Sequence, residues 1–565
     1  MAFSPFVICL FRPFKGLQRA YIAARSRTIT SLGTLLAQKM SNSDPWKTVA
    51  TAILLTLAVE HLPGRLYSLW EDGVVATLKL LAARIYLATP LGRKQLAEGE
   101  EKARSQLENT LLSNLDSPVQ TLPAAGLSQE QVLVKLRRMA DRDQTLSTTG
   151  KVSGGVYVKQ EELAFLQEVM KRFVLANQLH PEIFPSARQL ESEVVRMVVD
   201  LFHGDRNACG SLTTGGTESL LLMVLAYREW GRARGIRRPN IVAPVSVHAA
   251  VAKAGVYFDV RIKYVDLDPV TLEVDPKAVE QAITCNTVAI IASAPSFPHG
   301  TIDPITVLSD LALRKGVNMH VDCCLGGFLL PFMTDAGFPV SDFDFRVKGV
   351  TSISCDPHKY GCTPKGVSVI MYRSTELRRY QFFRKLDWPG GLYTTPTMGG
   401  SRSGMLAAAA WSVLVSKGRA GYVAQTKAVL TCVQNILQRL SEVPEIQVLG
   451  RPKASVIAFT SNIVNIYTLS ETLHKQNGWS LNSLQLPAAV HICITPANCH
   501  LGNQFIEDLK EGVARTKAMP NQDKSDSAAL YGMVATMPDK ASLNFICDAY
   551  LETMAMSEVG TGSNH

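Results

Sequence analysis

The sequence predicts an α/β fold with a mostly parallel sheet and helices on both of its faces. The composition is that of a globular protein, since 46% of the 565 residues are hydrophobic and 19% are charged. This excludes wholesale disorder and a coiled coil. From about residue 190, short β-rich runs alternate with helical stretches, which is the pattern of a parallel sheet. Runs such as Thr287–Ser293 are almost continuously apolar, as expected for strands buried on both faces.

The expected elements follow in chain order. Residues 90–125 are polar and helical in character and lead into a Pro- and Ser-containing linker. Apolar spacing predicts helices over Leu190–Phe202 and Thr217–Arg234, and Gly215–Gly216 opens the second of these. The predicted strands are 240–245, 260–265, 287–293, 317–321, 349–354 and 367–372.

Charge and cysteine content narrow the function classes. The net charge is +9, and six basic residues with no acidic residue lie in the first 43 positions, so the remainder is only mildly basic. We therefore expect no nucleic-acid partner. None of the eleven cysteines forms a CxxC pair, so we expect no zinc ribbon or other metal site. An odd number of scattered cysteines is typical of a protein that faces the cytosol, where thiols stay reduced.

The N-terminal segment carries a candidate membrane anchor. Thr48–Val59 is a run of twelve uncharged residues, whereas a spanning helix needs about 20 mostly apolar residues. Trp46 and Trp70 flank the run in the manner of an aromatic belt, but Lys47 and Glu60 oppose a span. A membrane span and a buried or interfacial helix therefore both stay open. The acid-free first 40 residues also suit a mitochondrial transit peptide.

Polar residues gather where the predicted parallel strands end. Ligands of such sheets bind beyond the carboxyl ends of the strands, so these positions are the candidates for a site. Taken singly, each residue has an ordinary structural explanation as a turn, a cap or a solvated side chain. Because all of them are expected at one edge of the sheet, they point to one shared ligand. The residues are His248, Asp322, His358, Lys359 and the pair Gly216–Thr217 at the head of a helix.

One cofactor, pyridoxal phosphate, suits this set. Its aldehyde needs a lysine amine for a Schiff base, which Lys359 offers. Its pyridine nitrogen needs a carboxylate, which Asp322 offers. Its phosphate suits free N–H groups at a helix N-terminus, as at Gly216–Thr217, and His358 would add a donor. A flat group is needed over the ring, and His248 can provide it.

The motifs around these residues resemble the sphingosine-1-phosphate lyases, a family of fold-type-I pyridoxal phosphate enzymes in the wider group II decarboxylase-like family. The likeness covers roughly residues 125–540. DPHKYGCTPKG (356–366) includes a His-Lys pair that many such decarboxylases share, whereas DFRVKGVTSIS (344–354) and LHPEIFP (179–185) are more specific to the lyases. The other matching segments include SGGVY (153–157), TTGGTES (213–219), HVDCCLGGF (320–328) and DWPGGLYTTPTMGGSR (387–402).

The resemblance implies roles for the residues of the cofactor site. Lys359 would form the Schiff base, Asp322 would hold the pyridine nitrogen and His248 would stack on the ring. The cofactor phosphate would be bound by Gly216, Thr217 and His358. Gly400 and Ser401 would reach it from the other subunit, which makes the enzyme a homodimer with shared active sites.

The resemblance also implies the substrate site and the reaction. Tyr157, His180 and Lys365 would bind the substrate phosphate, and Tyr393 would lie near the reaction centre. The reaction would be the retro-aldol cleavage of a phosphorylated long-chain sphingoid base into a long-chain aldehyde and phosphoethanolamine. Lys359, Tyr393 and the substrate phosphate all stay open as the group that takes the proton of the C3 hydroxyl.

Two other functions stay in view. A pyridoxal phosphate-dependent amino-acid decarboxylase would need a carboxylate site in place of the phosphate site that Tyr157 and Lys365 imply. A catalytically silent protein of this fold, acting as a membrane or partner-binding module, would have no reason to keep Lys359, Asp322 and His248 together.

The family likeness sets the expected domains and location. We expect the endoplasmic reticulum membrane with the catalytic part in the cytosol, and mitochondria as the alternative. Cys323 and Cys355 stand where the family more often has Ala, and we interpret these thiols as packing residues. The expected segments are the N-terminal segment with its candidate anchor (1–70), a helical region and linker (71–190), the large cofactor-binding domain (191–400), a small C-terminal α/β domain (401–545) and a disordered tail (546–565).

Overall fold

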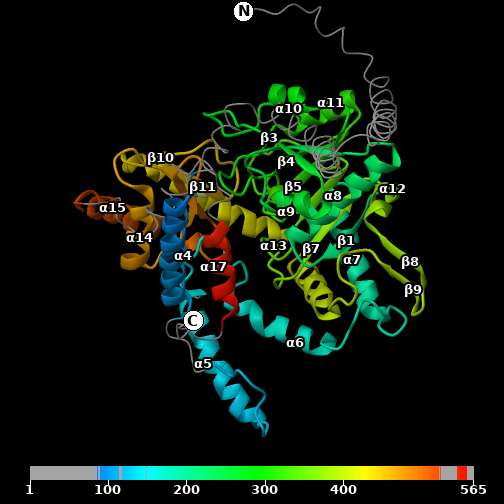
Figure 1. Cartoon of the computed structure of the whole chain (residues 1–565), viewed down its shortest axis with the longest axis horizontal. Coiled ribbons are helices and arrows are strands. Elements are labelled where there is room, and N and C mark those ends of the chain that lie inside the picture. Colours follow the sequence, from blue (N-terminus) through cyan, green and yellow to red (C-terminus); the bar gives the residue numbers. More distant parts are fainter. Residues whose placement is uncertain are drawn as a thin grey trace, which may run out of the picture. The chain divides into compact units, whose positions relative to one another are not determined.

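The computed structural model describes residue 86 and residues 89–112, 118–147, 149–520, 522 and 544–556. The chain divides into two compact units, residues 1–122 with 536–565 and residues 123–535 (Figure 1). In the first unit, helix α4 (Pro90–Leu111) packs against α17 (Asn544–Ala555). Thr89 caps α4, since its Oγ1 accepts from the N–H of Gly92, and Pro90 takes the first helical position.

A seven-stranded sheet organises the second unit. Its strand order is β1-β7-β6-β5-β4-β2-β3, and all neighbours are parallel except β7, which is antiparallel to both β1 and β6. The strands are β1 (Cys209–Thr213), β2 (Asn240–Pro244), β3 (Arg261–Val265), β4 (Thr287–Ser293), β5 (Asn318–Cys323), β6 (Ser352–Cys355) and β7 (Ser368–Tyr372). The mostly parallel sheet predicted from the sequence is therefore confirmed.

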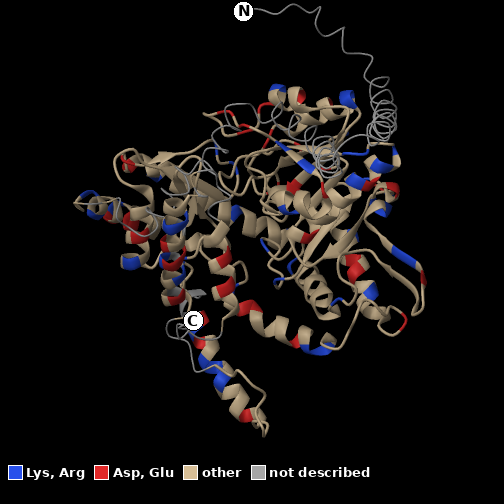
Figure 2. Ribbon diagram, in the orientation of Figure 1, with Lys and Arg blue, Asp and Glu red and all other residues tan. Residues whose placement is uncertain are grey.

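Helices cover both faces of this sheet. Alternate strand residues enter two separate hydrophobic cores: Val242 and Ile290 face one, Ile241 and Ile291 the other. The central strands carry almost no charge, whereas α4 and α5 carry both signs (Figure 2). The helices of this unit are α5 (Gln129–Ser147), α6 (Leu163–Phe173), α7 (Pro185–Leu201), α8 (Gly216–Ala233), α9 (Ala250–Phe258), α10 (Pro276–Ala282), α11 (Ile305–Lys315), α12 (Thr375–Arg378), α13 (Gly404–Arg439), α14 (Ile466–Asn477) and α15 (Gly502–Lys517).

Two smaller sheets complete the unit. One is antiparallel, with the order β10-β11-β13-β12. It packs against α14, and the ring of Phe459 contacts that of Phe505 on α15. The other is the hairpin of β8 (Phe383–Trp388) and β9 (Gly391–Thr395), which extends away from the central sheet in Figure 1. The strands of the antiparallel sheet are β10 (Gln447–Val448), β11 (Val456–Thr460), β12 (Asn482–Leu484) and β13 (Ala489–Cys493).

Three expectations differ from the structure. The sequence predicts no strand at β1, because Cys-Gly-Ser-Leu-Thr has little apolar character and its order comes from pairing with β7. The strand expected over 349–354 begins only at Ser352. The tail expected to be disordered from residue 546 is helical as far as Ala555.

The candidate anchor at Thr48–Val59 lies outside the described residues. In the part of the chain that the structure does describe, no helix combines the length and apolarity needed to cross a bilayer.

Candidate active site

Strands β5 and β6 place the two central groups of the predicted site side by side. They are parallel neighbours, with Asp322 opposite Ser354 in the register. Lys359 follows β6 in a tight turn, in which its N–H donates to the carbonyl of Asp356. Both groups therefore lie at the carboxyl edge of the sheet, as the sequence predicts.

Lys359 forms a buried ion pair with Asp356, a residue for which the sequence predicts no role. Its Nζ lies 2.9 Å from Oδ2 of Asp356, which is only 2% exposed. Burial lowers the pKa of Lys359, but the Asp356 carboxylate outweighs this and raises the pKa overall. The same pairing keeps the pKa of Asp356 below its usual range in spite of burial. The other oxygen of Asp356, Oδ1, is buried and has no partner among the described residues.

Asp322 is held through one oxygen only. Its Oδ1 accepts from the N–H of Cys324 at 3.1 Å and from Oγ of Ser354 at 3.2 Å. No hydrogen bond to Oδ2 occurs within the described residues. The carboxylate is thus fixed in orientation and has one oxygen available for a donor.

The head of α8 closes tightly on this pair. A Cβ on Gly216 would lie 2.8 Å from both Cys324 Sγ and Asp356 Oδ2, so only glycine fits. Glu218 fixes the preceding loop, since its Oε2 accepts from the N–H and the hydroxyl of Thr214, each at 2.7 Å. The first N–H groups of a helix have no partner within it, so Gly216 and Thr217 present free donors here.

Two histidines lie at the same edge. Nδ1 of His358 accepts from the N–H of Val367 at 3.3 Å, and its Nε2 faces Asp356 Oδ2 at 3.4 Å. His248 follows β2, and its Nδ1 accepts from the N–H of Ala250 at 3.1 Å. The Nε2 atoms of both rings therefore carry the proton in the neutral form.

Tyr157 and Lys365 meet beside the lysine turn. Nζ of Lys365 lies 4.8 Å from the ring centroid of Tyr157 and donates to the carbonyl of His358 at 3.4 Å. Burial raises the pKa of Tyr157, which stays a phenol and hence a donor. Partial burial lowers the pKa of Lys365, and the charge of Lys359 lowers it further. The charge of Lys359 thus disfavours the charged form of Lys365, which a bound anion would favour.

The remaining predicted residues form a second group. Oη of Tyr393 lies 2.5 Å from the place that a Cβ on Gly400 would occupy. Nδ2 of Asn177 donates to Oγ of Ser401 at 3.1 Å, and the N–H of His180 donates to the carbonyl of Asn177. Within the described residues, no hydrogen bond or ring contact joins this group to Lys359, Asp322 or Lys365. Likewise, no hydrogen bond, ion pair or ring contact of the described residues joins His180 to Tyr157 or Lys365.

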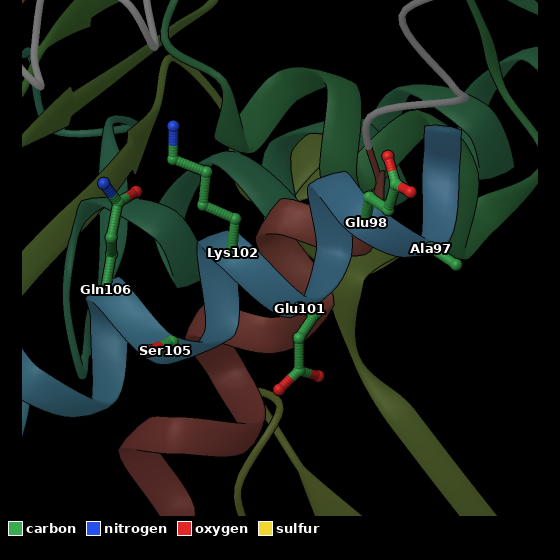
Figure 3. Close-up of a pocket in the computed structure, with 6 residues that line it drawn as sticks. All are labelled: Ala97, Glu98, Glu101, Lys102, Ser105 and Gln106. Atoms are coloured by element: carbon green, nitrogen blue, oxygen red, sulfur yellow. The ribbon is translucent and has the colours of Figure 1, made fainter. Parts of the chain in front are cut away.

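A shallow groove elsewhere has no catalytic arrangement. It lies along α4 in the first unit, and its side chains point in different directions, with Glu101 turned away from Lys102 and Gln106 (Figure 3).

Comparison with known proteins places this geometry in a family. Residues 154–462 match the family described as the pyridoxal-dependent decarboxylase conserved domain. The sphingosine-1-phosphate lyase 1 of Rattus norvegicus is 38% identical over 562 residues, which cover 98% of this chain and 96% of that protein. The sphingosine-1-phosphate lyase of Saccharomyces cerevisiae is 38% identical over 492 residues, or 85% of this chain and 83% of that one.

Comparison with solved structures supports the same family. The sphingosine-1-phosphate lyase of Burkholderia pseudomallei superposes with a TM-score of 0.69 at 42% identity, over 71% of this chain and 94% of that one. A glutamate decarboxylase of Lactobacillus brevis shares the fold alone, with a TM-score of 0.62 at 20% identity over 72% of this chain and 96% of that one. The cofactor expected from the sequence, pyridoxal phosphate, is the one this family uses, and the Lys359, Asp322 and Gly216 arrangement fits it. The chain belongs to the sphingosine-1-phosphate lyase family of pyridoxal phosphate-dependent enzymes.

Proposed function

We propose that this enzyme cleaves a phosphorylated long-chain sphingoid base between C2 and C3 and releases a long-chain aldehyde and phosphoethanolamine. The observation that carries the proposal is the contact of Lys365 with Tyr157, a cation and a phenol donor that can both bind an anion, near Lys359. Lys365 and Tyr157 would bind a phosphate on C1 of the substrate. The relatives named above are sphingosine-1-phosphate lyases, whose names state a phosphorylated sphingoid base as the substrate.

The cofactor side of the site has a complete set of partners. Bound pyridoxal phosphate supplies an electron sink for the pair released when the carbon–carbon bond breaks. Lys359 would hold the aldehyde carbon, and Oδ2 of Asp322 would accept a hydrogen bond from the protonated pyridine nitrogen. The N–H groups at Gly216 and Thr217 would bind the cofactor phosphate, together with His358. His248 would cover the ring face.

On the substrate side, Lys365 and Tyr157 bind the phosphate and fix C2 and C3 against the cofactor, and His180 contributes from its own loop. A base removes the proton of the C3 hydroxyl, a carbonyl forms at C3, and the bond electrons stay with C2, which later gains a proton. Lys359 and Tyr393 are the two groups of this chain that can move these protons.

We also propose that the enzyme is a homodimer with shared sites. The hairpin of β8 and β9 exposes apolar side chains, with Leu386 70%, Trp388 51% and Leu392 77% exposed. An isolated two-stranded hairpin is marginally stable in water, so such a surface calls for a covering partner. The hairpin carries Tyr393, whose contact with Gly400 lies apart from the Lys359 turn. A second copy would cover the hairpin. Tyr393, Gly400 and Ser401 of each copy would then reach the cofactor site of the other copy.

The cellular placement is a further proposal. Family likeness supports attachment to the endoplasmic reticulum membrane through the N-terminal segment, with the catalytic part facing the cytosol. The cysteines of the described residues are all unpaired, which suits that compartment. The domain boundaries near residues 190 and 400 are proposed on the same likeness. Imaging of the tagged full chain against endoplasmic reticulum and mitochondrial markers separates the two locations.

The test of the activity follows both products. The full chain loaded with pyridoxal phosphate is incubated with a long-chain base phosphate, and the aldehyde and phosphoethanolamine are measured by mass spectrometry. We expect both products from the wild type and neither from Lys359→Ala. A normal cofactor absorbance without either product would refute the proposal.

A further inference from the structure

A buried chain of hydrogen bonds ends on Asp322. Oγ of Ser354 contacts Oδ1 of Asp322 at 3.2 Å, and Nε2 of His320 contacts Ser354 Oγ at 3.1 Å. On its other side, Nδ1 of His320 contacts Oγ of Ser352 at 2.7 Å, and Oη of Tyr227 on α8 contacts Ser352 Oγ at 2.5 Å. His320, Ser352, Ser354 and Tyr227 are all fully buried.

The chemistry of these groups gives the chain a single direction. An ionised carboxylate only accepts, so the one hydroxyl proton of Ser354 goes to Asp322. Ser354 must then accept from His320, which places the imidazole proton on Nε2. A neutral imidazole has only one N–H, so Nδ1 accepts the hydroxyl proton of Ser352, which in turn accepts from Tyr227. Every donor thus points toward Asp322.

His320 is suited to this role because it stays neutral. Burial lowers its pKa to about 4, and the nearby Asp322 carboxylate only partly opposes this. A neutral ring with both nitrogens engaged has one tautomer and one orientation available. It therefore acts as a fixed donor to Ser354.

We propose that His320 is a positioning residue, which fixes Asp322 through Ser354 so that Oδ2 faces the pyridine nitrogen of the cofactor. The inference rests on the function proposed above for Asp322. It explains why one carboxylate oxygen is held by two donors while the other is available. A merely structural chain would satisfy buried polar groups without any effect on cofactor binding.

A double-mutant cycle on cofactor affinity tests the coupling. Pyridoxal phosphate is titrated into the full-length apoenzyme of the wild type, Ser354→Ala, Asp322→Asn and the double variant, and Kd is read from absorbance. We expect Ser354→Ala to raise Kd about tenfold, since a hydrogen bond to a charged group is lost. The double variant should match Asp322→Asn within about twofold, because Ser354 acts only through the carboxylate.

Tyr227→Phe is the matched control. It removes a buried hydroxyl of the same chain, but the tautomer of His320 does not depend on it. We expect its Kd to stay within about twofold of the wild type although its thermal stability falls as for other lost buried hydrogen bonds. An equal rise in Kd for Tyr227→Phe and Ser354→Ala, or effects of Ser354→Ala and Asp322→Asn that multiply, would overturn the proposal.

A second pair of variants protects the test against poor folding of Ser354→Ala. His320→Gln keeps an N–H that reaches Ser354, whereas His320→Phe has none. We expect Kd within about threefold of the wild type for Gln and about tenfold higher for Phe. Equal values for the two would contradict the proposal. Unchanged Kd and turnover in Asp322→Asn alone would instead refute the role proposed for Asp322, and the inference with it.

Discussion

Replacing Gly216 by alanine tests the close approach between the head of α8 and the Lys359 ion pair. The new Cβ would lie 2.8 Å from Asp356 Oδ2 and from Cys324 Sγ, and 3.1 Å from Asp356 Oδ1. Ordinary carbon contacts are about 3.5–4.0 Å, so the Asp356 carboxylate must move by roughly half an ångström or more. Asp356 cannot move without disturbing Lys359, whose Nζ is 2.9 Å away.

The size of the effect follows from the cost of overpacking. Overpacking a well-packed site costs about 1–3 kcal/mol, which corresponds to a loss of about fivefold to 150-fold in affinity. We expect Gly216→Ala to raise the Kd for pyridoxal phosphate by that factor, measured by absorbance titration of the apoenzyme. Turnover at saturating cofactor should fall as well, because Lys359 is displaced.

The neighbouring glycine is the control. A Cβ on Gly215 would come no nearer than 3.5 Å to His358 Cε1, an ordinary contact. The change from glycine to alanine is the same, but no atom is displaced, so we expect cofactor affinity within about threefold of the wild type and a stability cost of about 1 kcal/mol at most. Similar affinities for Gly215→Ala and Gly216→Ala would refute the geometric argument.

Three further predictions address the other groups. Asp322→Asn is expected to bind cofactor but lose most of its turnover, since an amide cannot keep the pyridine nitrogen protonated; near-normal turnover would show that its partner is misassigned. Because the pKa of Lys365 is lowered by burial and by Lys359, we expect kcat/KM to fall with rising pH at a lower pH than for an ordinary lysine, and to fall less in Lys365→Arg, whose charge persists; identical pH profiles would exclude Lys365 from phosphate binding. Leu392→Glu is expected to yield monomers by light scattering, whereas Val270→Glu, which changes a side chain 74% exposed elsewhere, should not; an intact dimer in both would place the interface away from the hairpin.

Periodicity and strand-end chemistry account for most of what could be predicted. Apolar runs such as Thr287–Ser293 predict the central strands. Because ligands bind beyond the carboxyl ends of parallel strands, Asp322 and Lys359 are predicted at one edge of the sheet. The edge strand β1 was not visible because its order depends on pairing with β7, a contact between residues far apart in the sequence.

The supporting residues of the site were harder to foresee. Asp356 stands in the DPHK motif, yet its pairing with Lys359 depends on the turn after β6, which only the folded chain defines. His320 and Ser354 lie in apolar strands, where ordinary packing is the usual role. Family likeness also groups Tyr393 and His180 with the Lys359 site, but within the described residues no hydrogen bond or ring contact joins them to Lys359. The homodimer proposed above, which the family likeness also implies, would account for this.

The most direct test of the central claim compares two products of one enzyme preparation. Carbon dioxide release from a panel of amino acids is measured beside aldehyde and phosphoethanolamine release from a long-chain base phosphate, with the same base lacking its phosphate as a control. We expect aldehyde and phosphoethanolamine in equal amounts from the phosphorylated base, much slower cleavage of the base without phosphate, and no carbon dioxide. Carbon dioxide from an amino acid, with no aldehyde from the phosphorylated base, would contradict the account and identify a decarboxylase.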